Sequence, residues 1–367
     1  MFTKAVFPGK YIQGQGVSRE LPGFIDLLGT KGLIIASPTV KSKILPGLFK
    51  GSLPDQIQVE QFRGECCELE LSRISRFIEQ EGMNVIVGMG GGKTIDAAKI
   101  VADRAGIPVI VVPTIASTDA PCSGCAVTYT AEGAFAAIHY QKMNPSMVLV
   151  DMDIIASAPT RFLISGMGDA LSTWFEARSC VQTHSRNECG GVSTLAGMHL
   201  SRLCYDTLLK YGVQACADSE AHLVTEALSN IAEANILLSG IGFESSGLAT
   251  AHSVHNGLTA LEETHAFYHG EKVAFGVLTG LHLTYASAEE MDTVYSFCES
   301  IGLPTTFAAL GLKHVRNDQL ERVAEKTCAP TESIYHEVVK VTPYEVLQAM
   351  IEADAMGFDR KVHTLPA

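Results

Sequence analysis

The chain has 367 residues, 47% hydrophobic and 18% charged, which is enough for two domains with sizeable cores and excludes a disordered chain or a disulfide-stapled mini-domain. Its formal net charge of −13 would repel a polyanion, which disfavours a general nucleic-acid or anionic-membrane binder and favours a small-molecule ligand. The ten cysteines are scattered, and neither an apolar signal segment nor a run of roughly 18 apolar residues is found, so we expect reduced cysteines in a cytoplasmic, non-membrane protein.

Short runs rich in Val and Ile alternate with helix-like stretches over residues 1–158. Four of these runs, at 32–36, 84–88, 108–112 and 147–151, have the continuous apolar character of strands buried on both faces. The pattern predicts an α/β domain with a parallel sheet.

Residues 159–367 change character to Leu, Ala, Met and Glu at helical spacing, interrupted by Gly or Pro. We therefore expect an all-helical second domain over this range. Neither a repeat nor a long charged linker separates the halves, so we expect a ligand cleft between them.

A glycine-rich turn, Gly88-Met-Gly-Gly-Gly-Lys-Thr-Ile-Asp-Ala-Ala-Lys99, joins the second predicted strand to a helix. Backbone amides at such a turn can approach a phosphate, and the helix N-terminus adds partial positive charge. The turn matches neither a Walker A loop, because position 87 is Val87, nor GxGxxG, because position 93 is Lys93. An anion cradle is favoured over the alternative of a glycine turn that serves only chain geometry.

A second polar loop, Pro113-Thr-Ile-Ala-Ser-Thr-Asp-Ala-Pro-Cys-Ser-Gly-Cys125, follows the next predicted strand. Ligands bind at this end of strands in open α/β sheets, which makes Asp119 a candidate ligand contact. An Asx-turn or helix N-cap is an equally good local interpretation of Asp119. The pair Cys122 and Cys125 lacks the partners of a zinc finger and the setting of a redox motif.

One carboxylate and several imidazoles in the second half could form a metal site. Asp169 follows glycines at a helix, and His252, His255 and His269 lie in two later segments. One carboxylate and two imidazoles suit zinc and leave one position for a substrate oxygen. A helix N-cap for Asp169 and ordinary core or surface histidines are the alternatives from spacing alone.

Together these motifs resemble the glycerol dehydrogenases of the iron-containing alcohol dehydrogenase and dehydroquinate synthase superfamily. The resemblance extends in order over essentially the whole chain and includes Trp174-Phe-Glu-Ala177, Gly242-Phe-Glu-Ser-Ser-Gly247, His252-Ser-Val-His-Asn-Gly-Leu-Thr259 and His269-Gly-Glu-Lys-Val-Ala-Phe-Gly276. It implies an NAD-binding domain over 1–158, an all-helical metal- and substrate-binding domain over 159–367, a Zn²⁺ ion in the cleft and a homo-oligomer, usually an octamer.

The resemblance also assigns roles to residues. It implies that Asp169, His252 and His269 bind zinc, that Asp119 contacts the substrate hydroxyls, and that Asp119 and His252 are the catalytic residues. Gly92 and Lys93 would hold the pyrophosphate of NAD, and the remaining cofactor contacts would be Thr114, Ser117, Ser123, Cys125 and Tyr129. His255 is not a ligand in this pattern and is expected beside the ligands or facing the cofactor. Iron-type members carry His four residues after the Asp, whereas this chain has Thr173, which favours zinc.

Ser37, at the end of the first predicted strand, departs from the pattern of the family. Many relatives have an Asp there that binds the adenosine ribose hydroxyls and repels the 2′-phosphate of NADP. Ser37 cannot repel that phosphate, so we expect NAD to be preferred by a narrower margin.

The resemblance implies oxidation of a vicinal polyol, glycerol to dihydroxyacetone, with hydride transfer to NAD. The alternatives are a glycerol-1-phosphate dehydrogenase, a dehydroquinate-synthase-like lyase and a non-catalytic metabolite-binding module. The first two act on phosphorylated substrates and would need a Lys or Arg cluster, which the sequence around Asp119 and His252 does not provide.

Overall fold

The computed structural model describes residues 2–49 and 53–364, which form two compact units. The sheet unit comprises Val6–Pro159 and Asp218–Gly240. The helical unit comprises the described residues of Met1–Ala5, Thr160–Ala217 and Ile241–Ala367. The sequence-based division at 158/159 placed residues 218–240 in the second domain, whereas in the structure this segment returns to the sheet unit.

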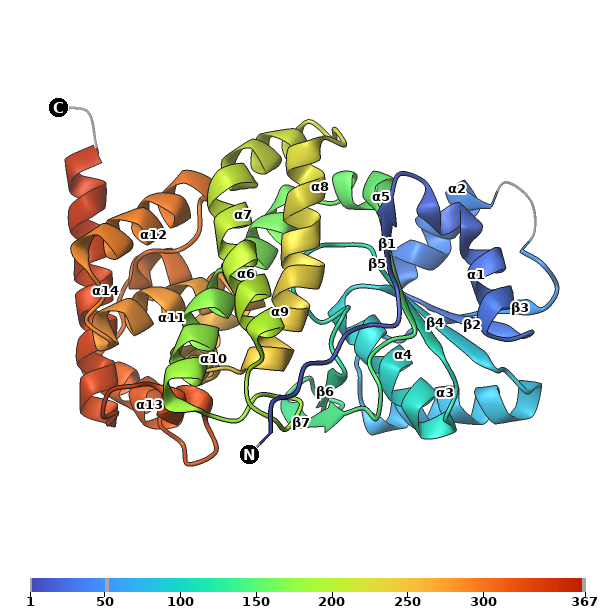
Figure 1. Cartoon of the computed structure of the whole chain (residues 1–367), viewed down its shortest axis with the longest axis horizontal. Helices are drawn as coiled ribbons and strands as arrows, with labels where there is room; N and C mark the ends of the chain where they lie inside the picture. The colour runs from blue at the N-terminus through green and yellow to red at the C-terminus, as the bar shows by residue number, and fades with distance from the viewer. Residues whose placement is uncertain (1, 50–52, 365–367) are drawn as a thin grey trace. The chain divides into compact units, whose positions relative to one another are not determined.

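The sheet unit contains a six-stranded sheet in which every neighbouring pair is parallel (Figure 1). The spatial order is β1-β8-β5-β4-β2-β3. The strands are β1 (Tyr11–Gly14), β2 (Gly32–Ala36), β3 (Ile57–Gln61), β4 (Val85–Gly90), β5 (Val109–Pro113) and β8 (Met147–Asp151). The order reverses between β2 and β4, since the chain first builds outward to β3 and then continues on the other side through β4 and β5.

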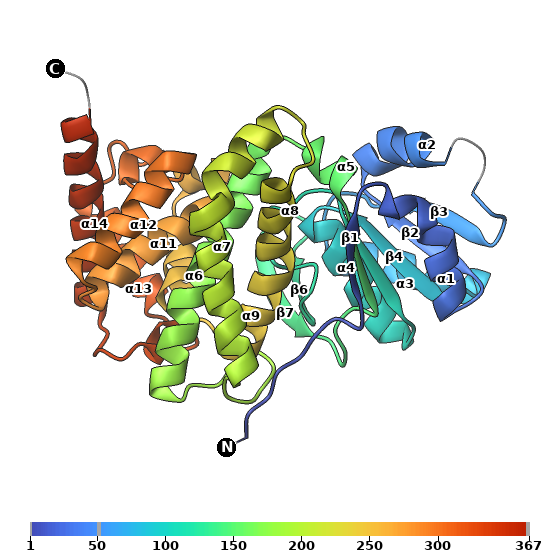
Figure 2. The ribbon, with the colours of Figure 1, turned by 45° about the horizontal axis from the view of Figure 1, so that its top comes forward.

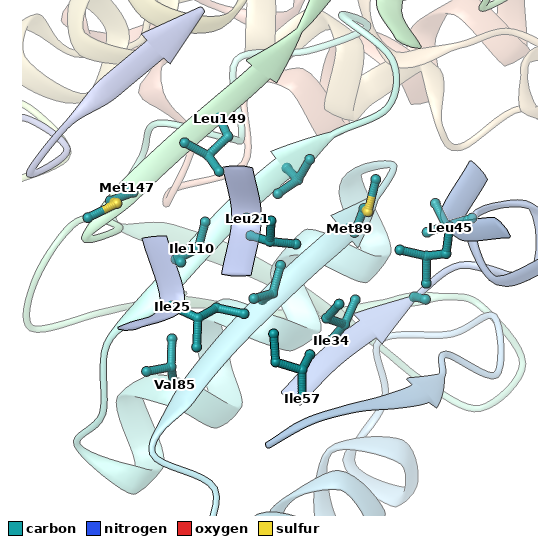
Figure 3. Close-up of a cluster of buried hydrophobic side chains, with 14 residues drawn as sticks. Leu21, Ile25, Ile34, Leu45, Ile57, Val85, Met89, Ile110, Met147 and Leu149 are labelled. Atoms are coloured by element: carbon teal, nitrogen blue, oxygen red, sulfur yellow. The ribbon is translucent and has the colours of Figure 1, made fainter. Parts of the chain in front are cut away.

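The four predicted strands are the interior ones, and their Val- and Ile-rich runs are buried throughout. Figure 3 shows the core on one face, where Leu21 and Ile25 of α1 (Leu21–Leu28) belong to the same buried cluster as Ile34 of β2. The helices α3 (Glu68–Glu81) and α4 (Gly92–Ala105) pack together, and α4 lies against β4 and β5. The predicted parallel α/β architecture is confirmed.

Four strands were not predicted. The edge strands β1 and β3 mix polar residues with apolar ones and are mostly half-buried. A separate antiparallel pair joins β6 (Cys125–Tyr129) to β7 (Phe135–Tyr140), and β7 is largely exposed. The weak apolar signal of β1 and β3 follows from their partial exposure, because edge strands need not be apolar on both faces. The run of β7, FAAIHY, is mostly apolar although it is largely exposed.

The secondary structure of this second unit consists mainly of helices, which confirms the predicted helical C-terminal region. The helix α11 (His269–Leu283) is buried almost all round and packs against α6 (Thr160–Thr183), α10 (Thr250–Leu258) and α14 (Pro343–Thr364). Figure 2 shows α7 (Leu195–Glu220) alongside α6. The Cys204 thiol of α7 approaches the Ala170 carbonyl of α6. No helix in the described residues is both long and apolar enough to cross a membrane. No disulfide joins the ten cysteines, all of which are described.

Candidate functional site

Three helices of the helical unit bring Asp169, His252 and His269 together. Asp169 lies within α6, His252 in the first turn of α10, and His269 at the first position of α11. One ligand atom from each residue lies within 4.8 Å of the other two. Asp169 Oδ1 lies 3.4 Å from His252 Nε2 and 3.0 Å from His269 Nε2, so both imidazoles present the same nitrogen to one carboxylate oxygen.

Glycines beside these residues let the three helices approach backbone to backbone. A Cβ on Gly270, next to His269, would lie 1.7 Å from the Ser165 carbonyl oxygen of α6. A Cβ on Gly276 would lie 2.3 Å from the Ala251 carbonyl oxygen of α10, next to His252. Real Cβ atoms do not approach that closely, so only glycine permits this spacing. Local sequence thus sets the distance between the ligand atoms.

The carboxylate of Glu176 fixes the orientation of His252. Glu176 lies seven residues after Asp169 on α6 and therefore on nearly the same helix face. Its Oε2 lies 2.6 Å from His252 Nδ1, and its Oε1 accepts from the backbone amides of Ala249 and His252 at 2.9 and 3.0 Å. A carboxylate accepts only, so His252 Nδ1 donates to it and Nε2 is left to act as a ligand.

His269 is oriented by a chain of side chains that begins on α10 and ends at Glu332. Its Nδ1 lies 3.1 Å from His255 Nε2, and His255 Nδ1 lies 3.1 Å from the amide oxygen of Asn256. Asn256 in turn donates to Glu332 Oε2 at 3.0 Å. If each imidazole donates from Nδ1, every contact in this chain is satisfied and His269 Nε2 keeps its lone pair.

The electrostatics of the cluster favour a positive charge at its centre. Burial alone would raise the pKa of the Asp169 carboxyl, but attraction from His269 and hydrogen bonds from both imidazoles hold that pKa well below its usual range. Burial opposes protonation of His252, yet Glu176 and Asp169 raise its pKa well above the ordinary value. Two imidazole nitrogens and a carboxylate around one point fit a divalent transition metal, which would supply that charge.

The sheet unit provides a second candidate site where the strand order reverses. Ser37 follows β2, and Gly92 and Lys93 open α4 directly after β4. Thr114 follows β5, and its amide donates to the Gly90 carbonyl at 3.1 Å. The ends of three neighbouring parallel strands therefore meet beside a helix N-terminus, which is where open α/β sheets bind nucleotide phosphates.

Lys93, predicted to hold a pyrophosphate, has partners within the protein. Its Nζ lies 2.5 Å from Glu65 Oε1 and 4.7 Å from the centre of the Tyr129 ring. Burial raises the pKa of Tyr129 to about 12, with further contributions from Asp96, Cys66 and Glu65. Tyr129 therefore stays neutral near pH 7, and its ring makes a cation–π contact with the Lys93 ammonium.

The predicted loop after β5 is held from several directions within the sheet unit. Asp119 is buried, and its Oδ2 accepts from the Ser239 hydroxyl at 2.8 Å. Asn235 Nδ2 donates to the Ala116 carbonyl at 3.0 Å. Both partners lie in the returning segment 218–240, which therefore orders the loop. Ser117 and Cys125, two predicted cofactor contacts, are half-buried there.

Ser123, another predicted cofactor contact, is buried. Its hydroxyl lies within 3.3 Å of the Ala120 and Cys125 carbonyls and of Lys99 Nζ. The structure thus gives Ser123 partners inside the loop itself.

Several residues beside these sites were missed by sequence reasoning. The available signal for Glu176 was its spacing of seven from Asp169, which places both carboxylates on one helix face. The contacts that Ser239, Asn235 and Glu65 make join residues far apart in the sequence. No local sequence pattern therefore predicts their roles.

Comparisons with known proteins agree over nearly the whole chain. A model of the iron-containing alcohol dehydrogenase family matches residues 8–152. The chain is 48% identical over 362 residues to a glycerol dehydrogenase of Thermotoga maritima, covering 98% of this chain and 99% of that protein. It is 46% identical to a glycerol dehydrogenase of Citrobacter freundii over 95% of this chain and 96% of that one.

A solved structure shares the same fold. The crystal structure of a probable glycerol dehydrogenase from Sinorhizobium meliloti superposes with a TM-score of 0.92 at 43% identity, covering 97% of this chain and 99% of that one. Since sequence identity and fold agree from end to end, the chain belongs to the glycerol dehydrogenases of the iron-containing alcohol dehydrogenase family, which are oxidoreductases.

Proposed function

We propose that this protein oxidises glycerol to dihydroxyacetone with NAD as the hydride acceptor and a divalent metal at the cluster of Asp169, His252 and His269. The observation that carries the proposal is the convergence of the two Nε2 atoms on Asp169 Oδ1. Its support comes from relatives named glycerol dehydrogenase at 46 and 48% identity.

We propose zinc as the metal. One carboxylate and two imidazoles leave one coordination position for substrate, which is the usual arrangement of catalytic zinc. Thr173, where iron-type members have a histidine ligand, is buried on α6 and offers no imidazole. The donor set present therefore favours zinc over iron.

The chain's own residues orient and polarise the reactants. When bound, the metal lowers the pKa of a substrate hydroxyl and NAD accepts the hydride. Glu176 and the chain from His255 to Glu332 keep both imidazoles turned so that Nε2 faces the metal position. Asp119 is proposed to bind substrate hydroxyls, and Ser239 holds its carboxylate in place.

Binding of NAD is assigned to the switch point of the sheet. We propose that Gly92 and Lys93 contact the pyrophosphate, that Ser37 faces the adenosine ribose, and that further contacts come from Thr114, Ser117, Ser123, Cys125 and Tyr129. The helix N-terminus at Gly92, which follows β4 directly, supports this assignment. The homo-octamer implied by the resemblance and the cytoplasmic location inferred from the sequence stay predictions.

Formation of NADH, followed by its absorbance, tests the proposal. Glycerol with NAD should give steady turnover, whereas glycerol 1-phosphate should give little. Arg161, on the helix that carries Asp169, is already paired with Glu271 at 2.7 Å. Turnover of the phosphorylated substrate with none on glycerol would contradict the proposal and favour the glycerol-1-phosphate alternative.

A further inference from the structure

A lysine in the core of the sheet unit is surrounded by oxygen atoms of the loop that carries Asp119. Lys99 lies on α4, and 1% of its surface is exposed. Its Nζ donates to the carbonyl oxygens of Ala120 at 2.8 Å and Ser123 at 3.0 Å, and to the Cys125 carbonyl. The Ser123 hydroxyl lies at 3.3 Å. Three backbone carbonyls and one hydroxyl thus converge on a single ammonium group.

Burying a charge this deeply is costly unless its surroundings compensate. The nearest carboxylate, Asp96 Oδ1, lies 3.8 Å from Nζ, which is too long for a strong ion pair. Asp96 is instead hydrogen-bonded through Oδ2 to the Val127 amide of β6 at 3.2 Å. The neutral oxygens of the loop therefore provide most of the close contacts to the ammonium.

The loop in turn depends on the Lys99 ammonium. Residues 114–124 contain neither helix nor strand, so their inward carbonyls have no regular backbone partners. Lys99 holds the Ala120 carbonyl directly beside Asp119, while Ser239 holds the Asp119 carboxylate itself. Asp119 is thus fixed from the backbone on one side and from the carboxylate on the other.

We propose that Lys99 is a positioning residue: its ammonium serves as a built-in cation that orders the loop of residues 113–125 and so aims Asp119 at the substrate. The proposal rests on the proposed function for the role of Asp119, whereas the ordering of the loop stands on the contacts of Lys99 alone. Lys99 touches neither substrate nor cofactor in this account.

Two variants separate positioning from bulk stability. Lys99→Met keeps most of the length of the side chain but removes all its donors, so glycerol kcat/KM should fall about tenfold to a hundredfold. Lys99→Ala removes the same group and leaves a space that n-propylammonium fits, so added n-propylammonium should restore much of the lost rate. It should not affect Lys99→Met or wild type. Arg104→Met, on the same helix but paired with Glu68 at the surface, is the matched control and should behave as wild type.

Amide hydrogen exchange provides a readout that does not require activity. In Lys99→Met, exchange should accelerate in residues 113–125 and stay unchanged in α6, α10 and α11, with metal content equal to that of wild type. This measurement distinguishes failure of the proposed function from failure of the proposal for Lys99. An inactive wild type would contradict the proposed function, and the exchange data would still test whether Lys99 orders the loop.

Three results would overturn the proposal: loop exchange and glycerol kcat/KM at wild-type values in Lys99→Met, acceleration spread evenly over both units, or no response of folded Lys99→Ala to n-propylammonium. If Lys99→Ala does not fold, the exchange and kinetic results of Lys99→Met decide.

Discussion

At the scale of single residues, one carboxylate determines which nitrogen of His252 is available to a metal. In Glu176→Gln, an amide NH₂ in place of Oε2 would donate to Nδ1 and drive the proton to Nε2, which blocks ligation. We expect metal affinity to fall about tenfold to a hundredfold while the fold is retained. Competition with a chromogenic chelator measures this affinity.

Glu337 offers a matched control for that substitution. It also accepts from the start of α10, through the Thr250 amide at 3.2 Å, and from the Ser179 hydroxyl at 2.6 Å, but it does not contact His252. Glu337→Gln should therefore keep wild-type metal affinity. Equal affinities in both variants and wild type would show that Glu176 does not set the orientation of His252.

Ser37 is the residue whose replacement tests the cofactor assignment. It is half-buried after β2, and a Cβ on Gly90 of the neighbouring strand would lie 3.1 Å from its own Cβ. Ser37→Asp should add ribose contacts for NAD and repel the 2′-phosphate of NADP, widening the NAD/NADP ratio of kcat/KM roughly tenfold or more. An unchanged ratio would mean that position 37 does not face the ribose.

Asp96 makes the stability of the sheet unit depend on pH. Burial raises the pKa of its carboxyl to about 6, although Lys99 and the Val127 amide lower it. The folded state therefore holds the proton more tightly than the unfolded chain, whose carboxyl has a pKa near 3.8. This stabilisation is complete below about pH 4 and is lost as pH rises through 6.

Urea unfolding of wild type and Asp96→Asn at equal protein concentration isolates this contribution. The neutral amide cannot titrate, so the free energy of unfolding of wild type relative to Asp96→Asn should decrease by about 1 to 3 kcal/mol between pH 4 and 7. The other groups facing Asp96 are Lys99, Cys66 and Tyr129, and burial raises the pKa values of Cys66 and Tyr129 to about 12, outside this range. A pH-independent difference would contradict the assignment.

At the scale of elements, close packing of α11 against α6 and α10 sets the metal geometry. Gly270→Ala would place a Cβ 1.7 Å from the Ser165 carbonyl oxygen and push the start of α11, with His269, away from Asp169. We expect a loss of about 1 to 3 kcal/mol or more in stability and a clear fall in metal affinity.

Gly280→Ala on the same helix is the control for this prediction. Its Cβ would meet Thr250 at 3.4 Å, an ordinary contact, so metal affinity should be retained. Differential scanning calorimetry and chelator competition measure both quantities. Wild-type metal affinity in Gly270→Ala would show that the spacing of these helices is not what aligns the ligands.

The elements also show what sequence could predict. The strands β2, β4, β5 and β8 were found because central parallel strands are buried on both faces and read as continuous apolar runs. The edge strands β1 and β3 escaped because half-buried positions accept Gln and Glu, as in the run IQVEQ of β3. Membership of 218–240 in the sheet unit was missed because it depends on contacts such as Asn235 to Ala116 across 119 residues.

At the scale of the whole molecule, the chemistry-bearing residues were easier to predict than their supports. The resemblance pointed to Asp169, His252 and His269, and the structure places these three together. Glu176, Ser239 and Lys99 orient the predicted residues. Their residue types are ordinary for a helix, so only the tertiary contacts reveal their roles. Sequence thus indicated the reaction, whereas the geometry that prepares it required the structure.

The most direct test of the account is the turnover of glycerol with NAD across a cycle of metal removal and return. Metal content is measured alongside NADH formation. We predict that chelation abolishes turnover while the fold is kept, that Zn²⁺ restores it as about one ion binds per chain, and that His252→Ala neither binds the ion tightly nor regains activity. Full turnover of glycerol in a sample verified to be metal-free would contradict the account.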